Sequence, residues 1–210
     1  MLITFEGLDF SGKTTQANLL LARLGGRGEV VHFIREPGGT PVSERVRTLL
    51  LDRSTPDIHP IAELFLFSAS RIQLVNEVIL PAIRRGETVV CDRYHDSTTA
   101  YQGYGRGISL EAVRTINRLA TEGIDPDVTL LIDIPLDEIE RRRTAAGLPA
   151  DRMESGGRSF YERVRAGYLE LARSEPARIL RLDGVAPVEE ISRRIWGIVE
   201  PRLLPPGRHP

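Results

Sequence analysis

The chain has 210 residues, 41% of them hydrophobic, and its 28 basic and 29 acidic side chains give a formal net charge of −1. This size predicts one folded domain with a packed core, and the balanced charge argues against a general nucleic-acid-binding or membrane-binding surface. A lone Cys91 excludes an internal disulfide bond. Since no signal peptide precedes the first strand and no 18-residue apolar run is present, we expect a cytoplasmic protein.

Short apolar strands alternate with helices along the chain. We expect strands over residues 2–6, 29–34, 88–91, 128–133 and 179–182. We expect helices over residues 15–24, 42–51, 58–85, 110–122, 136–146, 159–174 and 188–203, with kinks at Pro60 and Pro81 and with Ser109 as an N-cap. Short, apolar strands between helices predict an α/β fold, with a five-stranded parallel sheet covered on both faces and ligands at the strands' carboxyl ends. Residues 1–204 would form this domain, with a small lid at about 142–158 and a flexible tail at 205–210.

Residues 7–14 fit the pattern Gly-x-x-x-x-Gly-Lys-Ser/Thr of a phosphate-binding loop at every fixed position. The loop consists of Gly7, Leu8, Asp9, Phe10, Ser11, Gly12, Lys13 and Thr14. It lies between a predicted strand and a predicted helix, so backbone N–H groups and the helix dipole would face the phosphates of ATP, and the Thr14 hydroxyl can hold Mg²⁺. Lys13 is the one lysine beside 27 arginines, which fits a position where a compact ammonium must reach between phosphate oxygens.

Further polar features follow the strands. The segment Arg-Glu-Pro-Gly-Gly-Thr occupies residues 35–40, and Asp-Arg-Tyr occupies residues 92–94. Phe67 and Arg71 are four residues apart on one helical face. A polar region contains the arginines Arg141, Arg142, Arg143, Arg152 and Arg158. Taken singly, these features have ordinary explanations, namely a turn, a surface ion pair, a core phenylalanine and a solvated helix face.

In their order along the chain, these segments resemble thymidylate kinases, the enzymes that transfer the γ-phosphate of ATP to dTMP to give dTDP and ADP. The resemblance covers residues 2 to about 200 and rests on residues 5–9 with the phosphate loop, on residues 35–40, 92–103 and 151–154, and on the pair Phe67 and Arg71. Residues 35–40 and 92–103 are specific, whereas the phosphate loop is shared by many NTPases. The resemblance implies a P-loop NTPase fold of three α/β/α layers, Mg²⁺ as the cofactor, ATP and dTMP as the substrates, and a homodimer.

The resemblance also implies how dTMP would be held. Phe67 would stack on the thymine ring, Arg71 would donate to thymine O4, and Asp9 would hold the sugar 3′-hydroxyl or its waters. Tyr101 would form the wall against a 2′-hydroxyl. The other residues of the substrate pocket would be Arg35, Pro37, Arg47, Arg93, Thr98 and Gln102, with Arg93 on the dTMP phosphate, helped by Arg35 or Arg47. The Glu36–Pro37 peptide bond would be cis, beside two glycines that permit an unusual turn.

Catalysis of in-line phosphoryl transfer requires positioning and neutralisation of charge, and no covalent nucleophile. The catalytic residues would be Lys13, Asp92, Arg93, Arg142 and Arg152, with Asp92 and Thr14 at the Mg²⁺ ion. Some thymidylate kinases carry an arginine at the position of Phe10, and others supply it from the lid. Because Phe10 cannot neutralise charge, we expect a lid cation, Arg152 first and Arg142 or Arg143 second.

Three other classes of nucleotide-binding protein share parts of this pattern. A deoxynucleoside kinase also has a phosphate loop and an Asp-Arg pair, but it would not need several arginines around an acceptor phosphate, and another nucleoside monophosphate kinase is also an alternative. A GTPase-like switch needs an Asn-Lys-x-Asp motif to read guanine. The chain cannot contain that motif, because Lys13 is its only lysine.

Overall fold

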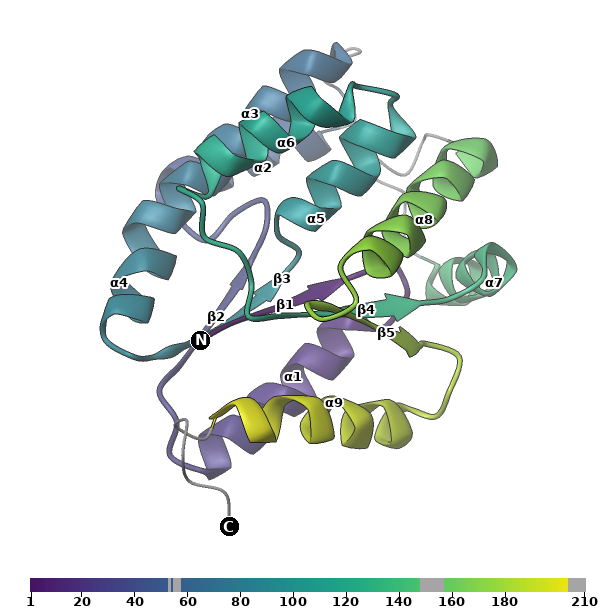
Figure 1. Cartoon of the computed structure of the whole chain (residues 1–210). Helices are drawn as coiled ribbons and strands as arrows, with labels where there is room; N and C mark the ends of the chain where they lie inside the picture. The colour runs from purple at the N-terminus through teal and green to yellow at the C-terminus, as the bar shows by residue number, and fades with distance from the viewer. Residues whose placement is uncertain (53, 55–57, 148–156, 204–210) are drawn as a thin grey trace.

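In the computed structural model of the chain, five parallel strands form one twisted sheet with helices on both faces (Figure 1). The structure describes residues 1–52, 54, 58–147 and 157–203. The strands are β1 (Leu2–Glu6), β2 (Val31–Arg35), β3 (Thr88–Asp92), β4 (Val128–Asp133) and β5 (Ile179–Asp183). They lie in the order β2-β3-β1-β4-β5, and every neighbouring pair is parallel. The predicted fold class and strand number are therefore confirmed.

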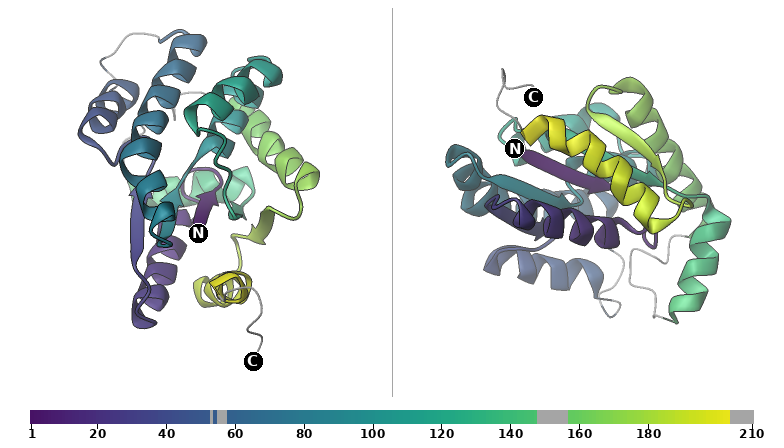
Figure 2. Two further views of the ribbon diagram at one scale, coloured as in Figure 1. Left: turned by 60° about the vertical axis from the view of Figure 1, so that its left-hand side comes forward. Right: turned by 90° about the horizontal axis from the view of Figure 1, so that it is seen from below.

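The helices connect consecutive strands. They are α1 (Lys13–Gly26), α2 (Pro41–Leu51), α3 (Pro60–Leu74), the π-helical turn η1 (Val75–Ile79), α4 (Leu80–Arg84), α5 (His95–Thr98), the π-helical segment η2 (Thr99–Gly105), α6 (Leu110–Ala120), α7 (Leu136–Ala146), α8 (Gly157–Ser174) and α9 (Val188–Leu203). Helices α1 and α9 lie side by side under one face of the sheet, as Figures 1 and 2 show. Most of the other helices cover the opposite face.

Successive residues of the central strands point to opposite faces of the sheet and pack against the helices there. Phe5 and Leu130 pack against α1 and α9, whereas Leu131 packs against α8 on the other face. Both faces of the central strands are covered, so β1 and β4 are buried along their whole length and consist mostly of apolar residues. The carboxyl ends of all five strands meet at one edge of the sheet, where the segments singled out in the sequence follow them.

Several element boundaries differ from the sequence-based expectation. The Pro60 residue begins α3 and does not kink it, because the first turn of a helix needs no N–H from that residue. Near Pro81, which also lacks an N–H, the helical run changes to the π-helical turn η1. Ser109 occupies the N-cap position of α6, but its side chain makes no capping bond. The helical run of α5 and η2 was not predicted, because residues 95–105 are rich in glycine, threonine and other weak helix formers.

A reciprocal contact joins η2 to α8. Gly105 of η2 lies against Phe160 of α8, and a Cβ atom at Gly105 would come within 2.6 Å of that ring. Gly167 of α8 lies against Tyr104 of η2, where a Cβ atom would again come within 2.6 Å of the ring. Each helix therefore supplies a glycine opposite an aromatic ring of the other, which brings the two backbones unusually close.

Among the described residues, one helical run, Pro60–Arg84, passes a length and composition test for crossing a membrane, with a mean hydropathy of 1.2. This run comprises α3, η1 and α4, and 39% of its most apolar window is buried inside the fold. Buried core helices pass the same test. Leu64, Leu74, Val75 and Ile79 of this run are fully buried, which accounts for its apolar composition.

Candidate active site

The phosphate loop takes its shape from residues with left-handed backbone conformations. Gly7 has φ 134°, and a Cβ atom there would come within 2.3 Å of the Ile132 carbonyl oxygen, so only glycine fits. Gly12 caps α1 with φ 97°, and Phe10 has φ 62°, which is uncommon for a residue with a side chain. The predicted sequence of strand, loop and helix is confirmed, with α1 beginning at Lys13 and not at residue 15.

Lys13 lies inside this loop with 6% of its surface exposed. Its Nζ atom donates to the Leu8 carbonyl oxygen at 2.8 Å. Burial, and then the positive charge of Arg93, lower the pKa of Lys13 to about 8. The ammonium is therefore held in a poorly solvated position, where a phosphate group would compensate its charge.

Thr14 and Asp92 form the pair that was predicted at the metal ion. The Thr14 hydroxyl donates to Asp92 Oδ2 at 2.7 Å, although the two residues are 78 positions apart. The described residues contain no cluster of three or more His, Cys, Asp or Glu side chains that would form a complete metal cage. One hydroxyl and one carboxylate suit Mg²⁺, because this ion usually takes its other ligands from water and substrate phosphates.

Two adjacent cavities open at the carboxyl edge of the sheet. The first, here called the phosphate cleft, is lined by Asp9, Phe10, Gly12, Lys13, Thr14, Thr15, Phe33, Arg35, Glu36, Arg47, Asp92, Arg93 and Arg142. The second, here called the acceptor pocket, is lined by Asp9, Glu36, Pro37, Arg47, Leu51, Phe67, Arg71, Arg93, Ser97, Thr98, Tyr101 and Gln102. The two share Asp9, Glu36, Arg47 and Arg93, so these residues lie at the junction between them.

Arg93 is the centre of this junction. Its Nη2 donates to Asp9 at 2.6 Å and to the Tyr101 hydroxyl at 3.3 Å, and its Nη1 donates to the Gly7 carbonyl oxygen at 3.0 Å. The backbone at Arg93 has φ 72°, a left-handed conformation that directs the chain out of β3. Burial opposes ionisation of Asp9, but the attraction of Arg93 outweighs it and lowers the pKa of Asp9 to about 2.

Arg71 is almost completely buried, with 1% of its surface exposed, yet it lines the acceptor pocket. It forms an ion pair with Glu36 at 2.7 Å. It also donates to the Asn117 side chain and to the Tyr94 carbonyl oxygen, each at 3.2 Å. The attraction of Arg71 only partly offsets the effect of burial on Glu36, so the pKa of that carboxyl is raised.

The wall of the acceptor pocket comes from α3, α5 and η2. Phe67 lies one helical turn before Arg71 on α3, as its sequence spacing predicts, and Glu63 lies one turn before Phe67. Gln102 donates to the buried carboxylate of Glu63 at 2.9 Å, and Arg106 pairs with the same carboxylate at 3.2 Å. The Gln102 side chain is therefore held in place from behind the pocket.

All but one of the residues predicted to bind the acceptor line this pocket. The exception is Arg35, which lines only the phosphate cleft and lies 3.3 Å from Glu44 on α2. Arg47 lines both cavities and donates to the Pro37 carbonyl oxygen at 2.9 Å, so it is better placed than Arg35 to reach the acceptor. The predicted cis bond between Glu36 and Pro37 is confirmed.

The arginines of the predicted lid lie in different surroundings. Arg142 donates to the carbonyl oxygens of Phe10 and Ser11, each at 3.3 Å, and so touches the phosphate loop directly. Arg143 lines a small cavity beside Phe10. Arg158 lines the same cavity, and it pairs with the exposed carboxylates of Asp137, Glu140 and Glu162. Arg152 lies outside the described residues.

Sequence reasoning missed a buried network beneath the phosphate loop. The carboxylate of Glu6, at the end of β1, accepts hydrogen bonds from the Ser97 hydroxyl at 2.6 Å and from the Tyr168 hydroxyl at 2.9 Å. Both hydroxyls in turn accept from Arg93. Burial raises the pKa of Glu6, with the nearby charge of Asp96 adding to it. A glutamate at the end of an apolar strand was the one sequence signal for this network.

A model of the thymidylate kinase family matches residues 5–195 of the chain. Thymidylate kinase from Chlorobaculum parvum is 48% identical over 213 residues, covering 98% of both chains. The enzyme of that name from Deinococcus radiodurans is 48% identical over 202 residues, covering 96% of this chain and 97% of that one. The crystal structure of thymidylate kinase from Ehrlichia chaffeensis matches with a TM-score of 0.75 and 34% identity, over 95% of this chain and 98% of that chain. With the phosphate loop and the acceptor pocket meeting at one edge of its sheet, the chain belongs to the thymidylate kinase family of ATP-dependent phosphotransferases.

Proposed function

We propose that the phosphate cleft binds the phosphates of ATP and that the acceptor pocket binds dTMP, with transfer taking place at their junction. The observation that carries this assignment is the position of Arg93, which lines both cavities while it pairs with Asp9. A cation at that point can hold the acceptor phosphate in line with the γ-phosphate next to Lys13. The protein then contributes positioning and charge neutralisation, which phosphoryl transfer requires.

We propose Mg²⁺ as the cofactor, held by Thr14 and by Asp92 directly or through water. The pair is already joined by a hydrogen bond of 2.7 Å beside Lys13. When bound, the ion would neutralise charge on the ATP phosphates. Thr14 and Asp92 supply the hard oxygen donors that Mg²⁺ prefers, and Lys13 supplies a second positive charge on the same side of the cleft.

Replacing Arg71 tests the assignment of the two cavities. In Arg71→Ala we expect the KM for dTMP to rise by about tenfold or more, because a charge-assisted hydrogen bond worth about 1.5–3 kcal/mol is lost. The KM for ATP should change by less than about threefold, since Arg71 does not line the phosphate cleft. Steady-state kinetics with each substrate varied in turn would measure both. A larger rise in the KM for ATP would mean that the two sites are reversed.

The single lysine provides a chemical test of the ATP site. An amine-directed reagent should modify only Lys13 and the N-terminus, and the rate at Lys13 should rise with pH around a midpoint of about 8, because only the neutral amine is nucleophilic. Mg²⁺–ATP should protect Lys13 and leave the N-terminus reactive. Peptide mass spectrometry across pH 6–11 would quantify both sites. Equal modification of Lys13 with and without ATP would contradict its placement.

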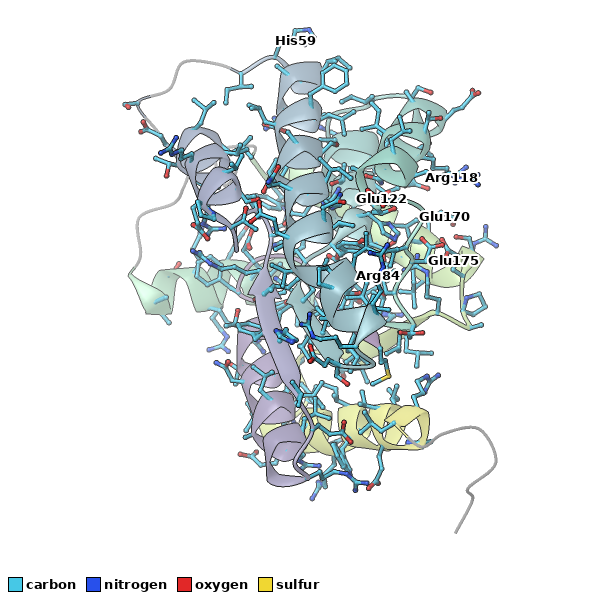
Figure 3. All side chains as sticks on the ribbon, turned by 90° about the vertical axis from the view of Figure 1, so that its left-hand side faces the viewer. His59, Arg84, Arg118, Glu122, Glu170 and Glu175 are labelled. Carbon is cyan, nitrogen blue, oxygen red and sulfur yellow. The ribbon has the colours of Figure 1, made fainter. Side chains whose placement is uncertain are left out.

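We propose that the enzyme is a homodimer that associates through α2, α3 and α6, which lie on the side of the molecule seen in Figure 3, with His59 just before α3 and Arg118 on α6. Large apolar side chains are exposed on all three helices, including Phe65 at 55% and Leu119 at 72%. We expect sedimentation to show a dimer at micromolar concentration and Phe65→Glu to shift it to monomer. The matched variant Val185→Glu, at an exposed apolar residue before α9, should remain dimeric.

We further propose that the enzyme works in the cytoplasm, with no nucleic-acid or membrane partner. The near-zero net charge gives no broad electrostatic attraction to phosphate backbones or anionic lipid. The lone Cys91 is buried at the end of β3, and its Sγ donates to the Arg93 carbonyl oxygen at 2.8 Å. A free thiol in this position is compatible with a reducing compartment.

A further inference from the structure

The guanidinium group of Arg71 is clamped by groups from three different segments. Glu36 comes from the loop after β2, Asn117 from α6, and the Tyr94 carbonyl oxygen from the segment after β3. The Tyr94 ring also lies under the guanidinium, with 5.6 Å between Cζ and the ring centroid. A side chain fixed from so many directions has almost no freedom to change its orientation when a ligand enters.

Most of the N–H donors of Arg71 are already used by contacts within the protein. A guanidinium has five N–H groups. Nε and Nη2 each lie 2.7 Å from Glu36 Oε2, Nη2 also donates to the Tyr94 carbonyl oxygen, and Nη1 donates to Asn117 Oδ1. Within the described part of the chain, these contacts use four of the five N–H groups. One N–H of Nη1 remains, on a side chain that lines the acceptor pocket.

We infer that Glu36 and Asn117 are positioning residues that hold Arg71 so that its remaining N–H selects a carbonyl, and rejects an amino group, at C4 of the pyrimidine. This inference rests on the proposed role of Arg71 at the base of dTMP. A carbonyl oxygen accepts the N–H, whereas the amino group of cytosine presents a second donor to it. Two facing donors cannot pair with each other, and a fixed guanidinium cannot turn away to relieve the conflict.

Glu36 supplies the charge that keeps Arg71 in place. Its side chain is 4% exposed, so without this carboxylate the guanidinium would be a buried and uncompensated cation. The second oxygen of Glu36, Oε1, is buried and has no hydrogen-bond partner among the described residues. Glu36 also lines the acceptor pocket, so direct contact with the substrate through Oε1 is the alternative that the experiment must separate.

Asn117 fixes the other side of the guanidinium without lining the pocket. Its Nδ2 donates to the His95 carbonyl oxygen at 3.2 Å and to the Thr99 hydroxyl at 3.0 Å. Because these two acceptors determine which way the amide lies, its Oδ1 must face Arg71. Asn117 does not line the acceptor pocket, and Arg71 is the pocket-lining side chain to which it bonds.

Substitution of the two positioning residues tests the inference on the full-length enzyme. Dissociation constants for dTMP, dUMP and dCMP would be measured by competition for wild type, Glu36→Gln and Asn117→Leu. Both dTMP and dUMP carry a carbonyl at C4, so we expect each variant to weaken them equally, by about tenfold. Binding of dCMP should change by less than about threefold, so the preference for dTMP over dCMP falls while the ratio of dTMP to dUMP is kept. An equal loss for all three nucleotides would overturn the inference.

A double-mutant cycle with Arg71→Ala separates positioning from direct contact. In the Arg71→Ala background, Glu36→Gln and Asn117→Leu should have almost no further effect on dTMP binding. Additive losses would show that Glu36 contacts the substrate itself and would contradict the inference for that residue. Glu77→Gln, which neutralises an exposed carboxylate on η1, is the matched control and should bind like wild type.

Thermal melting would confirm that each variant is folded, and the Asn117 variant keeps the test decisive if Glu36→Gln does not fold. A wild-type enzyme that failed to phosphorylate dTMP would contradict the proposed function, which is a different outcome from an unchanged base preference in the variants.

Discussion

Lys13→Ala should abolish nearly all phosphoryl transfer, with kcat falling by about a hundredfold or more. The ammonium is the one lysine charge in the chain, and it lies within the phosphate loop beside the Thr14 and Asp92 pair. Removing a preorganised charge from a transferring group typically costs several kcal/mol of transition-state stabilisation. Retention of more than about a tenth of the wild-type kcat would contradict the role assigned to Lys13.

The fold should tolerate this substitution. Burial opposes the charge on Lys13 and lowers its pKa to about 8, so the folded protein gains little from the ammonium in the absence of nucleotide. We therefore expect the melting temperature of Lys13→Ala to stay near that of wild type. Lys13→Arg should be almost as inactive, because a planar guanidinium cannot replace a compact ammonium between phosphate oxygens. Arg27→Ala, which removes an exposed cation just after α1, is the control and should retain full activity.

Replacing the lid arginines one at a time should give one large loss of kcat, and the other replacements should have smaller effects. In Arg152→Ala we expect kcat to fall by about a hundredfold or more with little change in dTMP affinity, because a donor to the transition state would be lost. Arg158→Ala should be close to wild type, since its three exposed ion pairs contribute little. Arg142→Ala should raise the KM for ATP, because this side chain holds two carbonyl oxygens of the phosphate loop.

Single alanine variants at Arg142, Arg143, Arg152 and Arg158 would be compared for kcat and for dTMP affinity. The reason to expect a lid cation is Phe10, whose side chain lines the phosphate cleft and cannot neutralise charge. If none of the four variants lowers kcat by even about tenfold, the missing cation is not in the lid.

Local patterns predicted those parts of the site that lie within single segments. The phosphate loop could be predicted because glycines, a lysine and a threonine at fixed spacing have one common use between a strand and a helix. Phe67 and Arg71 could be placed on one face because they are four residues apart in a helix. The residues that hold Arg71 could not be predicted in this way, since Asn117 is 46 positions away from it and depends on the packing of α6 against α3.

The same limit explains why the sequence left Arg35 and Arg47 as alternatives and why one helical run was not predicted. Arg35 and Arg47 were equally plausible partners of the acceptor phosphate, and the fold of residues 35–40 turns Arg35 toward Glu44 and leaves Arg47 at the junction of the two cavities. The helical run of α5 and η2 was missed because its local propensity is low. Its contact with α8 through Gly105 and Gly167 stabilises a helix that the isolated sequence would not favour.

The paired glycines of η2 and α8 have a mechanical consequence. Because Phe160 and Tyr104 each fill the space left by a glycine on the opposite helix, neither helix can slide or rotate against the other without driving a ring into backbone. The two helices must then move as one rigid unit, and η2 carries Tyr101 and Gln102 of the acceptor pocket. Any movement of α8 would therefore carry Tyr101 and Gln102 with it, so the wall of the acceptor pocket can shift only together with this helix.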